Sequence, residues 1–327
     1  MPEKPRSPLS PCRQTVLPVD PIGGERRQFL KMLSSTAAAA AVAAPALAST
    51  GSQVNTADAK DNRTILITGA TSGLGRHVAE RLAGPTTTIL IHGRDRSRAE
   101  EVLTAIRGAG GTGRFYRADL ASLAEVFGLA DAIMKDHRQL DVLVNNAGIY
   151  TGKADEGRQV SKDGHELRFA VNYLAPFALT RRLLPLLTAS RPARIVNVAS
   201  SGQTAIDFND VMLSRGYSAQ RAYGQSKLAL NMFTIDLAKE LQGSGVIANS
   251  VHPANYMDTP MVRESGIRPW STVDDGAVAV LHLINSPDVE GQGLYFSGQR
   301  PSRANSQAYD EEARARLRTL STQLTNS

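Results

Sequence analysis

Thr64-Ile-Leu-Ile-Thr68, followed at once by Gly69-Ala-Thr-Ser-Gly-Leu-Gly75, is the stretch of this 327-residue sequence that decides the fold. The first run is short, apolar and β-branched, which suits a buried parallel strand. The glycines lead into residues 76–83, whose apolar positions have helical spacing. A dinucleotide site requires this order of strand, glycine turn and helix, because glycines let the backbone approach a pyrophosphate at the helix N-terminus. The spacing is GxxxGxG rather than GxGxxG, so on this motif alone a plain glycine-rich turn stays open.

Residues 88–92 form a second predicted strand, which ends at Gly93-Arg94-Asp95. At such a strand tip an acidic side chain accepts hydrogen bonds from a ribose 2′-hydroxyl, whereas an arginine suits a 2′-phosphate. Arg94 therefore favours NADP(H) over NAD(H). Asp95 follows it, and charged residues in such loops are often only solvated.

A third motif, Tyr223-Gly-Gln-Ser-Lys227, lies far downstream. A tyrosine and a lysine four residues apart on a helix share one face. The ammonium is expected to favour phenolate and to lower the pKa of the tyrosine from its ordinary value of about 10. Such a phenol can donate a proton to a carbonyl or accept one from an alcohol. The motif is common, and a half-buried tyrosine beside a solvated lysine is the ordinary alternative.

Together with Asn145-Asn-Ala-Gly148, which follows the apolar run 140–144, these motifs resemble the short-chain dehydrogenase/reductase family. Asn172 and a fifth apolar strand that ends in two serines complete the family's order. The resemblance extends from about residue 64 to about residue 322. Within the family the sequence is most similar to the retinol dehydrogenase-like reductases, on the basis of residues 205–210 and 293–298.

The resemblance implies four catalytic residues. Tyr223 would be the general acid/base, and Lys227 would hold the nicotinamide ribose and lower the pKa of the tyrosine. Ser200 would bond the substrate oxygen, and Asn172 would help to order a water in the proton relay. The family's spacing selects Ser200 over its neighbour Ser201. Asn172 as an ordinary helix-interior asparagine bonded to backbone is the alternative.

The resemblance also implies a set of cofactor-binding residues, although residue 254 is alanine where relatives have glycine, and the threonine beyond it lies one residue late. For the third-strand aspartate, a helix cap is the alternative role. The implied set is Gly69, Ser72, Gly73, Leu74 and Gly75 at the pyrophosphate, Arg94 at the 2′-phosphate, Asp119 and Leu120 near the adenine, Asn146, Ala147 and Gly148 at the adenosine ribose, Tyr223 and Lys227 at the nicotinamide ribose, and Pro253 and Thr259 near the nicotinamide amide.

The first fifty residues resemble an export signal. Glu25-Arg-Arg-Gln-Phe-Leu-Lys31 is similar to a twin-arginine motif, and residues 32–48 are uncharged and rich in alanine, ending in Ala46-Leu-Ala48. This run is too short and too weakly apolar to predict a membrane span. We therefore expect a signal peptide at 1–48, a flexible leader at 49–63 and the dehydrogenase domain at 64–327, in a periplasmic protein. Translation from Met32 would delete both arginines and leave a cytoplasmic protein.

Composition narrows the range of partners. Residues 1–48 carry six basic and three acidic side chains, so their removal lowers the formal charge from +6 to +3. This charge is too small and too scattered to indicate nucleic acid. The sole cysteine, Cys12, lies in the removed segment, and the six histidines show no metal-binding spacing. Neither a disulfide nor a metal is therefore expected. The expected partners are a small carbonyl or alcohol substrate and the export machinery, and a homo-oligomer stays open.

Alternating strand and helix patterns from residue 64 onward predict an α/β fold: a single Rossmann-type, doubly wound parallel sheet with helices on both faces. Residues 311–320 indicate a charged surface helix. The segments 202–222 and 255–270 should wall the substrate pocket, and their apolar side chains favour an apolar alcohol or carbonyl compound. They include Ile206, Phe208, Met212, Tyr256 and Trp270.

The predicted function is hydride transfer between a nicotinamide and this substrate. A non-catalytic dinucleotide-binding sensor or scaffold is the main alternative, although all four catalytic residue types are present. A sugar-nucleotide epimerase or dehydratase also uses the tyrosine–lysine motif, but the glycine spacing and the lack of a long C-terminal substrate domain argue against it.

Overall fold

The computed structural model describes residues 62–150 and 157–326, so the predicted signal peptide and nearly all of the predicted leader lie outside the described residues. One sheet of eight strands runs through the described chain in the order β3-β2-β1-β4-β5-β6-β7-β8, with only the β7–β8 pair antiparallel. The strands are β1 (Arg63–Ile67), β2 (Thr87–Gly93), β3 (Thr112–Arg117), β4 (Val142–Asn145), β5 (Ala193–Val198), β6 (Val246–His252), β7 (Tyr295–Ser297) and β8 (Arg300–Ser302). The predicted α/β class and single parallel sheet are confirmed, and the short edge strand β8 is an addition.

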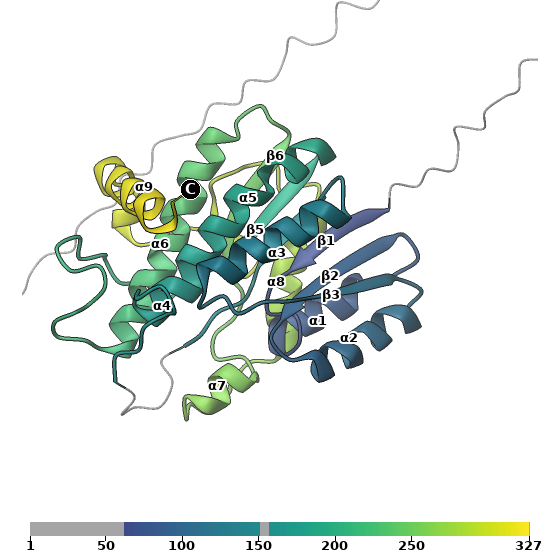
Figure 1. The fold of residues 1–327 in the computed structure, drawn as a ribbon, viewed down its shortest axis with the longest axis horizontal. Coiled ribbons are helices and arrows are strands. Elements are labelled where there is room, and N and C mark those ends of the chain that lie inside the picture. Colours follow the sequence, from purple (N-terminus) through teal and green to yellow (C-terminus); the bar gives the residue numbers. More distant parts are fainter. Residues whose placement is uncertain (1–61, 151–156, 327) are drawn as a thin grey trace, which may run out of the picture. The chain divides into compact units, whose positions relative to one another are not determined.

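Helices cover both faces of this sheet (Figure 1). The α-helices are α1 (Gly73–Leu82), α2 (Arg96–Gly108), α3 (Leu123–Asp136), α4 (Leu167–Phe169), α5 (Ala175–Ser190), α6 (Ala219–Glu240), α7 (Pro260–Glu264), α8 (Val273–Asn285) and α9 (Glu311–Thr325). A π-helical turn, η1 (Ala170–Leu174), joins α4 to α5, and a 3₁₀ turn, η2 (Ser306–Tyr309), precedes α9.

The alternation of side chains along β1 divides the core into two layers. Leu66 packs in the cluster formed with α3, α5 and α6. Ile65 and Ile67 point to the opposite face and pack with α1, α2 and α8. Because both faces are covered, the strand is apolar at every one of these positions, as its sequence indicated.

The strand order reverses beside β1, which pairs with β2 on one side and with β4 on the other. In a doubly wound sheet this switch point leaves a crevice at the carboxyl ends of the strands. The glycine turn follows β1 at this point, and the Asn145-Asn-Ala-Gly148 segment follows β4. Two motifs that lie far apart in the sequence therefore meet at one edge of the sheet.

The C-terminal helix α9 differs from the charged, solvated helix that was expected, because one of its faces is buried. Ala313 and Leu317 join the core, and Arg314 is only 5% exposed. The Arg314 guanidinium lies 2.7 Å from the carboxylate of Asp236 on α6. The expectation failed because the apolar positions are interleaved with charged ones, and a buried arginine cannot be told from a solvated one by sequence.

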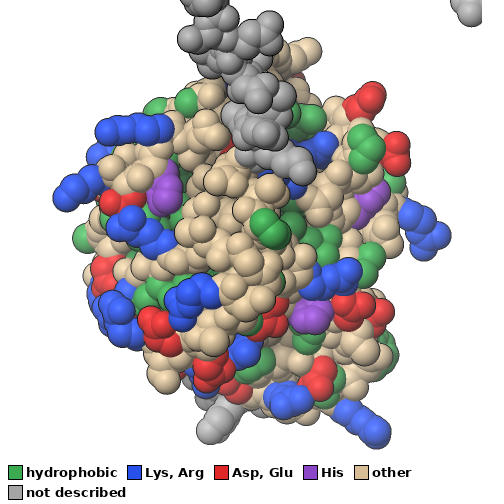
Figure 2. Space-filling model, turned by 90° about the vertical axis from the view of Figure 1, so that its right-hand side faces the viewer, with side chains coloured by type: hydrophobic (Ala, Val, Ile, Leu, Met, Phe, Trp, Pro, Cys, Tyr) green, Lys and Arg blue, Asp and Glu red, His purple; other side chains and the backbone are tan. Residues whose placement is uncertain are grey.

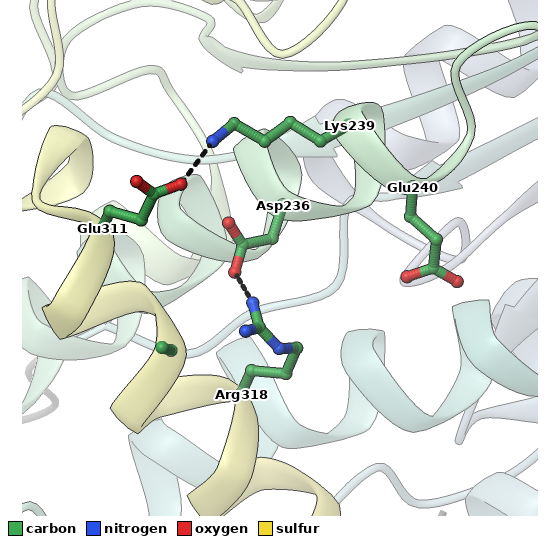
Figure 3. Close-up of a pocket in the computed structure, with 6 residues that line it drawn as sticks. Asp236, Lys239, Glu240, Glu311 and Arg318 are labelled. Carbon is green, nitrogen blue, oxygen red and sulfur yellow. Dashed lines mark hydrogen bonds and ion pairs between the residues drawn. The ribbon is translucent and has the colours of Figure 1, made fainter.

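Ion pairs extend along the seam between α6 and α9 (Figure 3). Arg318 lies 2.6 Å from Asp236, and Lys239 lies 3.0 Å from Glu311. A hollow of about 270 Å³ lies here, lined by Asp236, Lys239, Glu240, Glu311, Ala315 and Arg318. The lining charges are paired, with Glu240 bonded to Arg181 on α5 outside the hollow, so this is a structural seam between two helices.

Charges of both signs are interspersed on the face of the molecule that Figure 2 shows. None of the described helices is long and apolar enough to cross a membrane. Within residues 62–150 and 157–326, no group of three or more histidine, cysteine or acidic side chains is placed to hold a metal ion.

Candidate active site

The glycine turn is folded tightly against the segment that follows β4. Gly69 and Gly73 have φ angles of +64° and +53°, in the left-handed region that favours glycine. A Cβ at Gly69 would lie 2.9 Å from the Cα of Ala147, and one at Gly75 would lie 2.5 Å from the carbonyl oxygen of Gly69. These glycines are therefore required by the packing of the turn itself, as well as by any ligand that approaches it.

The N-terminus of α1 fits an anionic group such as a pyrophosphate. Ser72 is the N-cap residue, but it makes no side-chain cap, and the first turn carries no acidic residue. The N–H groups of this turn and the positive end of the helix dipole therefore suit a phosphate. Thr259, predicted near the nicotinamide, is buried and lies 3.3 Å from the Cβ position of Gly73. The structure thus brings the α7 segment to the glycine turn. Leu74 is buried in the core, and Pro253 directly follows β6.

The Asn145-Asn-Ala-Gly148 segment holds the site together. The side-chain amide of Asn146 donates to the carbonyl of Thr68 at 2.8 Å, and the Ala147 N–H donates to the Thr68 hydroxyl at 3.0 Å. The Cβ position of Gly148 lies 3.1 Å from Oδ1 of Asn172 and 3.4 Å from Nζ of Lys227. Asn146 and Ala147 therefore fasten the end of β1, while Gly148 lies against two predicted catalytic residues. Contact of the three with a ribose stays a prediction.

At the tip of β2, Asp95 is committed to a structural role. Its carboxylate caps α2, accepting from the N–H groups of Ser97 and Arg98 at 2.9 and 3.2 Å. Arg94 beside it is exposed at the strand tip. Of the two charged side chains at this position, Asp95 is therefore the one used to cap the helix.

Asp119 lies between β3 and α3. The helix begins at Leu123 with Ser122 as its N-cap, so Asp119 is not the cap residue that the alternative supposed. Its carboxylate accepts from the Ala121 N–H at 3.1 Å in a local turn. The adjacent Leu120 is buried in the core.

The four predicted catalytic residues converge beyond the carboxyl end of β5. Tyr223 and Lys227 lie on α6, Ser200 follows β5, and Asn172 lies in the π-turn η1. Nζ of Lys227 lies 5.8 Å from the centre of the Tyr223 ring and donates to the Val198 carbonyl at 2.8 Å. The Ser200 hydroxyl accepts from the Gly202 N–H at 3.1 Å and lies near enough to Tyr223 to act on the pKa of its phenol.

Asn172 connects three parts of this site. Its Oδ1 accepts from the Ile149 N–H at 2.8 Å, and its Nδ2 donates to the Ile149 carbonyl at 3.0 Å. Nδ2 also donates to the Ser226 hydroxyl at 3.0 Å, next to Lys227. A π-turn re-aims a side chain within a helix and is frequent at functional sites. Asn172 is therefore bonded to backbone, as the alternative reading supposed. These hydrogen bonds nevertheless lie inside the candidate site.

Burial sets the ionisation of the central pair. It raises the pKa of Tyr223 to about 12, an effect that the nearby Ser200 hydroxyl opposes. Burial also lowers the pKa of Lys227 to about 8. The pKa of Tyr223 is therefore raised where a net lowering was expected, because loss of hydration is the largest effect and the Lys227 ammonium donates to a backbone carbonyl.

Two neighbours of the motif residues have other partners. The Ser201 hydroxyl faces Oδ1 of Asn255 at 3.4 Å, whereas Ser200 faces Tyr223. Tyr217, which also lies on the approach to α6, accepts a hydrogen bond from the buried Arg168 at 2.8 Å. The geometry therefore favours Ser200 and Tyr223 for chemistry.

Sequence reasoning missed Tyr150 and Tyr295, two of the tyrosines around Tyr223. The ring of Tyr150 lies 4.7 Å from that of Tyr223, at an interplanar angle of 87°. The hydroxyl of Tyr295 donates to the Ser200 carbonyl at 3.2 Å. Tyr256 is close enough to raise the pKa of Tyr223 slightly, and its ring lies 5.4 Å from that of Trp270. The signal in the sequence that could have identified Tyr150 is its place two residues after the Asn-Asn-Ala-Gly motif.

The expected pocket wall is only partly correct. Tyr256 and Trp270 lie at the surface, and Trp270 is 72% exposed. Ile206 is instead buried in the core, and Phe208 and Met212 pack against the same cluster. These three side chains therefore pack in or against the core.

A family model described as short chain dehydrogenase matches residues 63–269 of this chain. Human retinol dehydrogenase 13 is 35% identical over 277 residues, which cover 78% of this chain and 82% of the relative. Mouse retinol dehydrogenase 14 is 35% identical over 286 residues, covering 79% and 84%. Mouse polyprenol dehydrogenase is 34% identical over 277 residues, covering 78% and 81%. The predicted similarity to retinol dehydrogenases is confirmed.

Solved structures have the same fold. An uncharacterised protein from Mycobacterium paratuberculosis superposes with a TM-score of 0.68 at 32% identity, over 82% of this chain and 94% of that one. The Pseudomonas aeruginosa RhlG/NADP active-site complex superposes with a TM-score of 0.60 at 28% identity, over 73% and 95%. The second of these proteins carries the dinucleotide NADP.

Proposed function

The chain belongs to the short-chain dehydrogenase family and is an NAD(P)-dependent oxidoreductase, and we propose that it interconverts an apolar alcohol and its carbonyl compound through Tyr223. The observation that carries the proposal is the meeting of Tyr223, Ser200 and Lys227 beside the glycine turn, at the switch point of the sheet. A sensor without turnover would not need this group of side chains together.

Each side chain has a role that its contacts support. With its pKa near 12, Tyr223 is protonated at neutral pH and is ready to donate its proton to a carbonyl oxygen. The Ser200 hydroxyl, which lies near Tyr223, can orient the same oxygen. Lys227, with a pKa near 8, is mostly charged at pH 7 and stabilises the phenolate that remains after donation. The nicotinamide, when bound, supplies or accepts the hydride at the carbonyl carbon.

Asn172 acts on this group through the backbone. It holds Ile149 by both amide atoms and so fixes the neighbouring Tyr150, whose ring packs against Tyr223. Its remaining bond to Ser226 places it beside Lys227 on α6. These contacts support a role for Asn172 at the inner end of a proton path that leads from Tyr223 past Lys227.

An apolar substrate is supported by the aromatic surroundings and by the relatives. Tyr150, Tyr256 and Trp270 offer aromatic surface near the reacting phenol. The relatives are named for retinol and polyprenol, both apolar alcohols. The test is NADPH consumption with long-chain aldehydes against short polar ones of equal reactivity. We expect a preference of at least about 10-fold in kcat/KM for the apolar set, and an equal rate for both sets would contradict the substrate class.

NADP(H) is the proposed cofactor in preference to NAD(H). Arg94 is exposed at the strand tip, while Asp95 is occupied as a helix cap. Replacing Arg94 by alanine should weaken NADPH binding by about 10-fold or more and leave NADH binding nearly unchanged. An equal loss for both cofactors would show that Arg94 does not recognise the 2′-phosphate.

Export through a twin-arginine signal is proposed from sequence alone, on residues 25–48. Replacement of Arg26 and Arg27 by lysine should leave the protein unprocessed in the cytoplasm, and unchanged fractionation would contradict export.

Pairing of subunits through α5 and α6 is also a proposal. Because α9 already packs against α6, such a dimer would have to use the surfaces of α5 and α6 that α9 leaves uncovered.

A further inference from the structure

His92, at the carboxyl end of β2, is a buried titratable residue to which the proposed mechanism gives no role. Its side chain is only 3% exposed. Nδ1 lies 3.2 Å from the backbone nitrogen of Gly69, and Nε2 lies 3.1 Å from the carbonyl oxygen of Ala118. One imidazole therefore bridges two loops that come from different strands.

The partners fix the tautomer of this imidazole. The Gly69 N–H can only donate and the Ala118 carbonyl can only accept, so Nδ1 must be bare and Nε2 must carry the proton. Burial holds the pKa of His92 down to about 4, with Asp119 acting in the opposite sense and Arg94 in the same sense. The ring is therefore neutral at physiological pH, which is the state that both hydrogen bonds require.

The two loops are the ones that would enclose a dinucleotide. Gly69 is the first glycine of the turn at α1, and Ala118 immediately precedes Asp119 and Leu120. Backbone bonds reinforce the bridge: the Ala70 N–H donates to the His92 carbonyl at 2.9 Å, and the Ala118 N–H donates to the Gly93 carbonyl at 3.3 Å. The imidazole thus adds a side-chain link at the point where β1, β2 and β3 end.

We propose that His92 is a positioning residue for the dinucleotide, whose neutral Nε2–H imidazole holds the glycine turn and the 118–120 loop at the separation that binding requires. The proposal rests on the dinucleotide site proposed above. His92 does not touch the reacting atoms, so its loss should act on cofactor affinity and leave the chemistry of Tyr223 intact.

Two amide variants separate the two hydrogen bonds. In His92→Asn the side-chain oxygen can take the place of Nδ1 and accept from Gly69, but the side chain is too short for Ala118. In His92→Gln the longer amide can donate to Ala118 in place of Nε2. His92→Ala removes both bonds, and His77→Ala, on the exposed face of α1, is the matched histidine control.

The measurement is the Kd for NADPH from cofactor fluorescence, at a temperature where thermal melts show every variant folded. We expect His92→Ala to raise Kd by about 10-fold or more, His92→Asn and His92→Gln by less, and His77→Ala not at all. The value of kcat at saturating NADPH should change less than about 3-fold. If His92 had a merely structural role, its loss would lower the melting temperature without raising Kd while kcat stays nearly constant.

Histidine ¹⁵N NMR of the wild type should show a bare Nδ1 and a protonated Nε2 at pH 7. The opposite tautomer or an imidazolium would overturn the proposal, as would an unchanged Kd in folded His92→Ala. If the wild type binds neither NADPH nor NADH, the proposed dinucleotide site itself fails. Wild-type binding with unchanged binding by His92→Ala refutes the role of His92 alone.

Discussion

The two ends of α6 treat buried charge in opposite ways. Near its start, Lys227 is 4% exposed and is bonded to a backbone carbonyl, with no described carboxylate paired to it. Near its end, Asp236 is shared between Arg314 and Arg318. A buried cation without a counter-ion costs free energy, and the Lys227 ammonium bears this cost at a position beside Tyr223. The comparison teaches that the first end is arranged for chemistry and the second for stability.

The largest expected effect is at the catalytic end. Tyr223→Phe keeps the ring but removes the only proton that the mechanism donates. We expect kcat to fall by about 100-fold or more, with the melting temperature nearly unchanged, because the ring packing is retained. Steady-state assays and a thermal melt measure the two. Near-normal turnover would remove Tyr223 from its proposed role.

The opposite end of α6 should respond in the reverse way. Arg314→Met removes the buried partner of Asp236, and we expect the free energy of unfolding to fall by about 3 kcal/mol without a change in kcat. Urea denaturation gives the stability. Arg318→Met is the control, since its side chain is half exposed and its loss should cost less than about 1 kcal/mol. An equal effect of the two would mean that burial does not distinguish the pairs.

Lys227→Met sharpens the comparison because stability and activity should move in opposite directions. It removes an unpaired buried cation, so we expect about 1–2 kcal/mol of added stability at pH 7, with a loss of kcat and of cofactor affinity. If the variant instead proves less stable at pH 7, the ammonium is better solvated than its contacts indicate.

The pH dependence of this difference follows from the lowered pKa of Lys227. Between its folded value of about 8 and its ordinary value of 10.5, the unfolded chain binds a proton that the folded chain does not. The stability of the wild type therefore rises relative to Lys227→Met as pH increases across this window. Urea denaturation of both proteins at pH 7 and pH 10 measures the effect, and a gap that stays constant would contradict the lowered pKa.

The sequence was sufficient for the sheet and for the meeting of its motifs. An apolar run such as 64–68 is typical of a parallel strand buried on both faces, and the glycine turn marks where β1 ends. These signals are local in the chain. They predicted β1 and β2 to within one residue at each end, whereas the fifth strand was expected to continue through Ser200 and Ser201 and β5 ends at Val198. The parallel sheet brings the glycine turn to the segment after β4.

The sequence was insufficient where a property depends on surroundings. The pKa of Tyr223 was expected to fall, but burial by distant segments raises it. Arg314 was assigned to a solvated face because its partner, Asp236, lies on another helix. His92 looked like an ordinary strand residue, since both of its partners are backbone atoms of loops that only the fold brings near.

The most direct test of the central claim is to follow the transferred hydride with an isotope label. The purified enzyme would be given an apolar aldehyde such as retinal and NADPH fully deuterated at C4 of the nicotinamide, and the product would be analysed by mass spectrometry. We predict an alcohol that carries one deuterium on its carbinol carbon, formed by the wild type and barely detectable with Tyr223→Phe. An alcohol without deuterium, or equal labelled product from both proteins, would contradict the proposed mechanism.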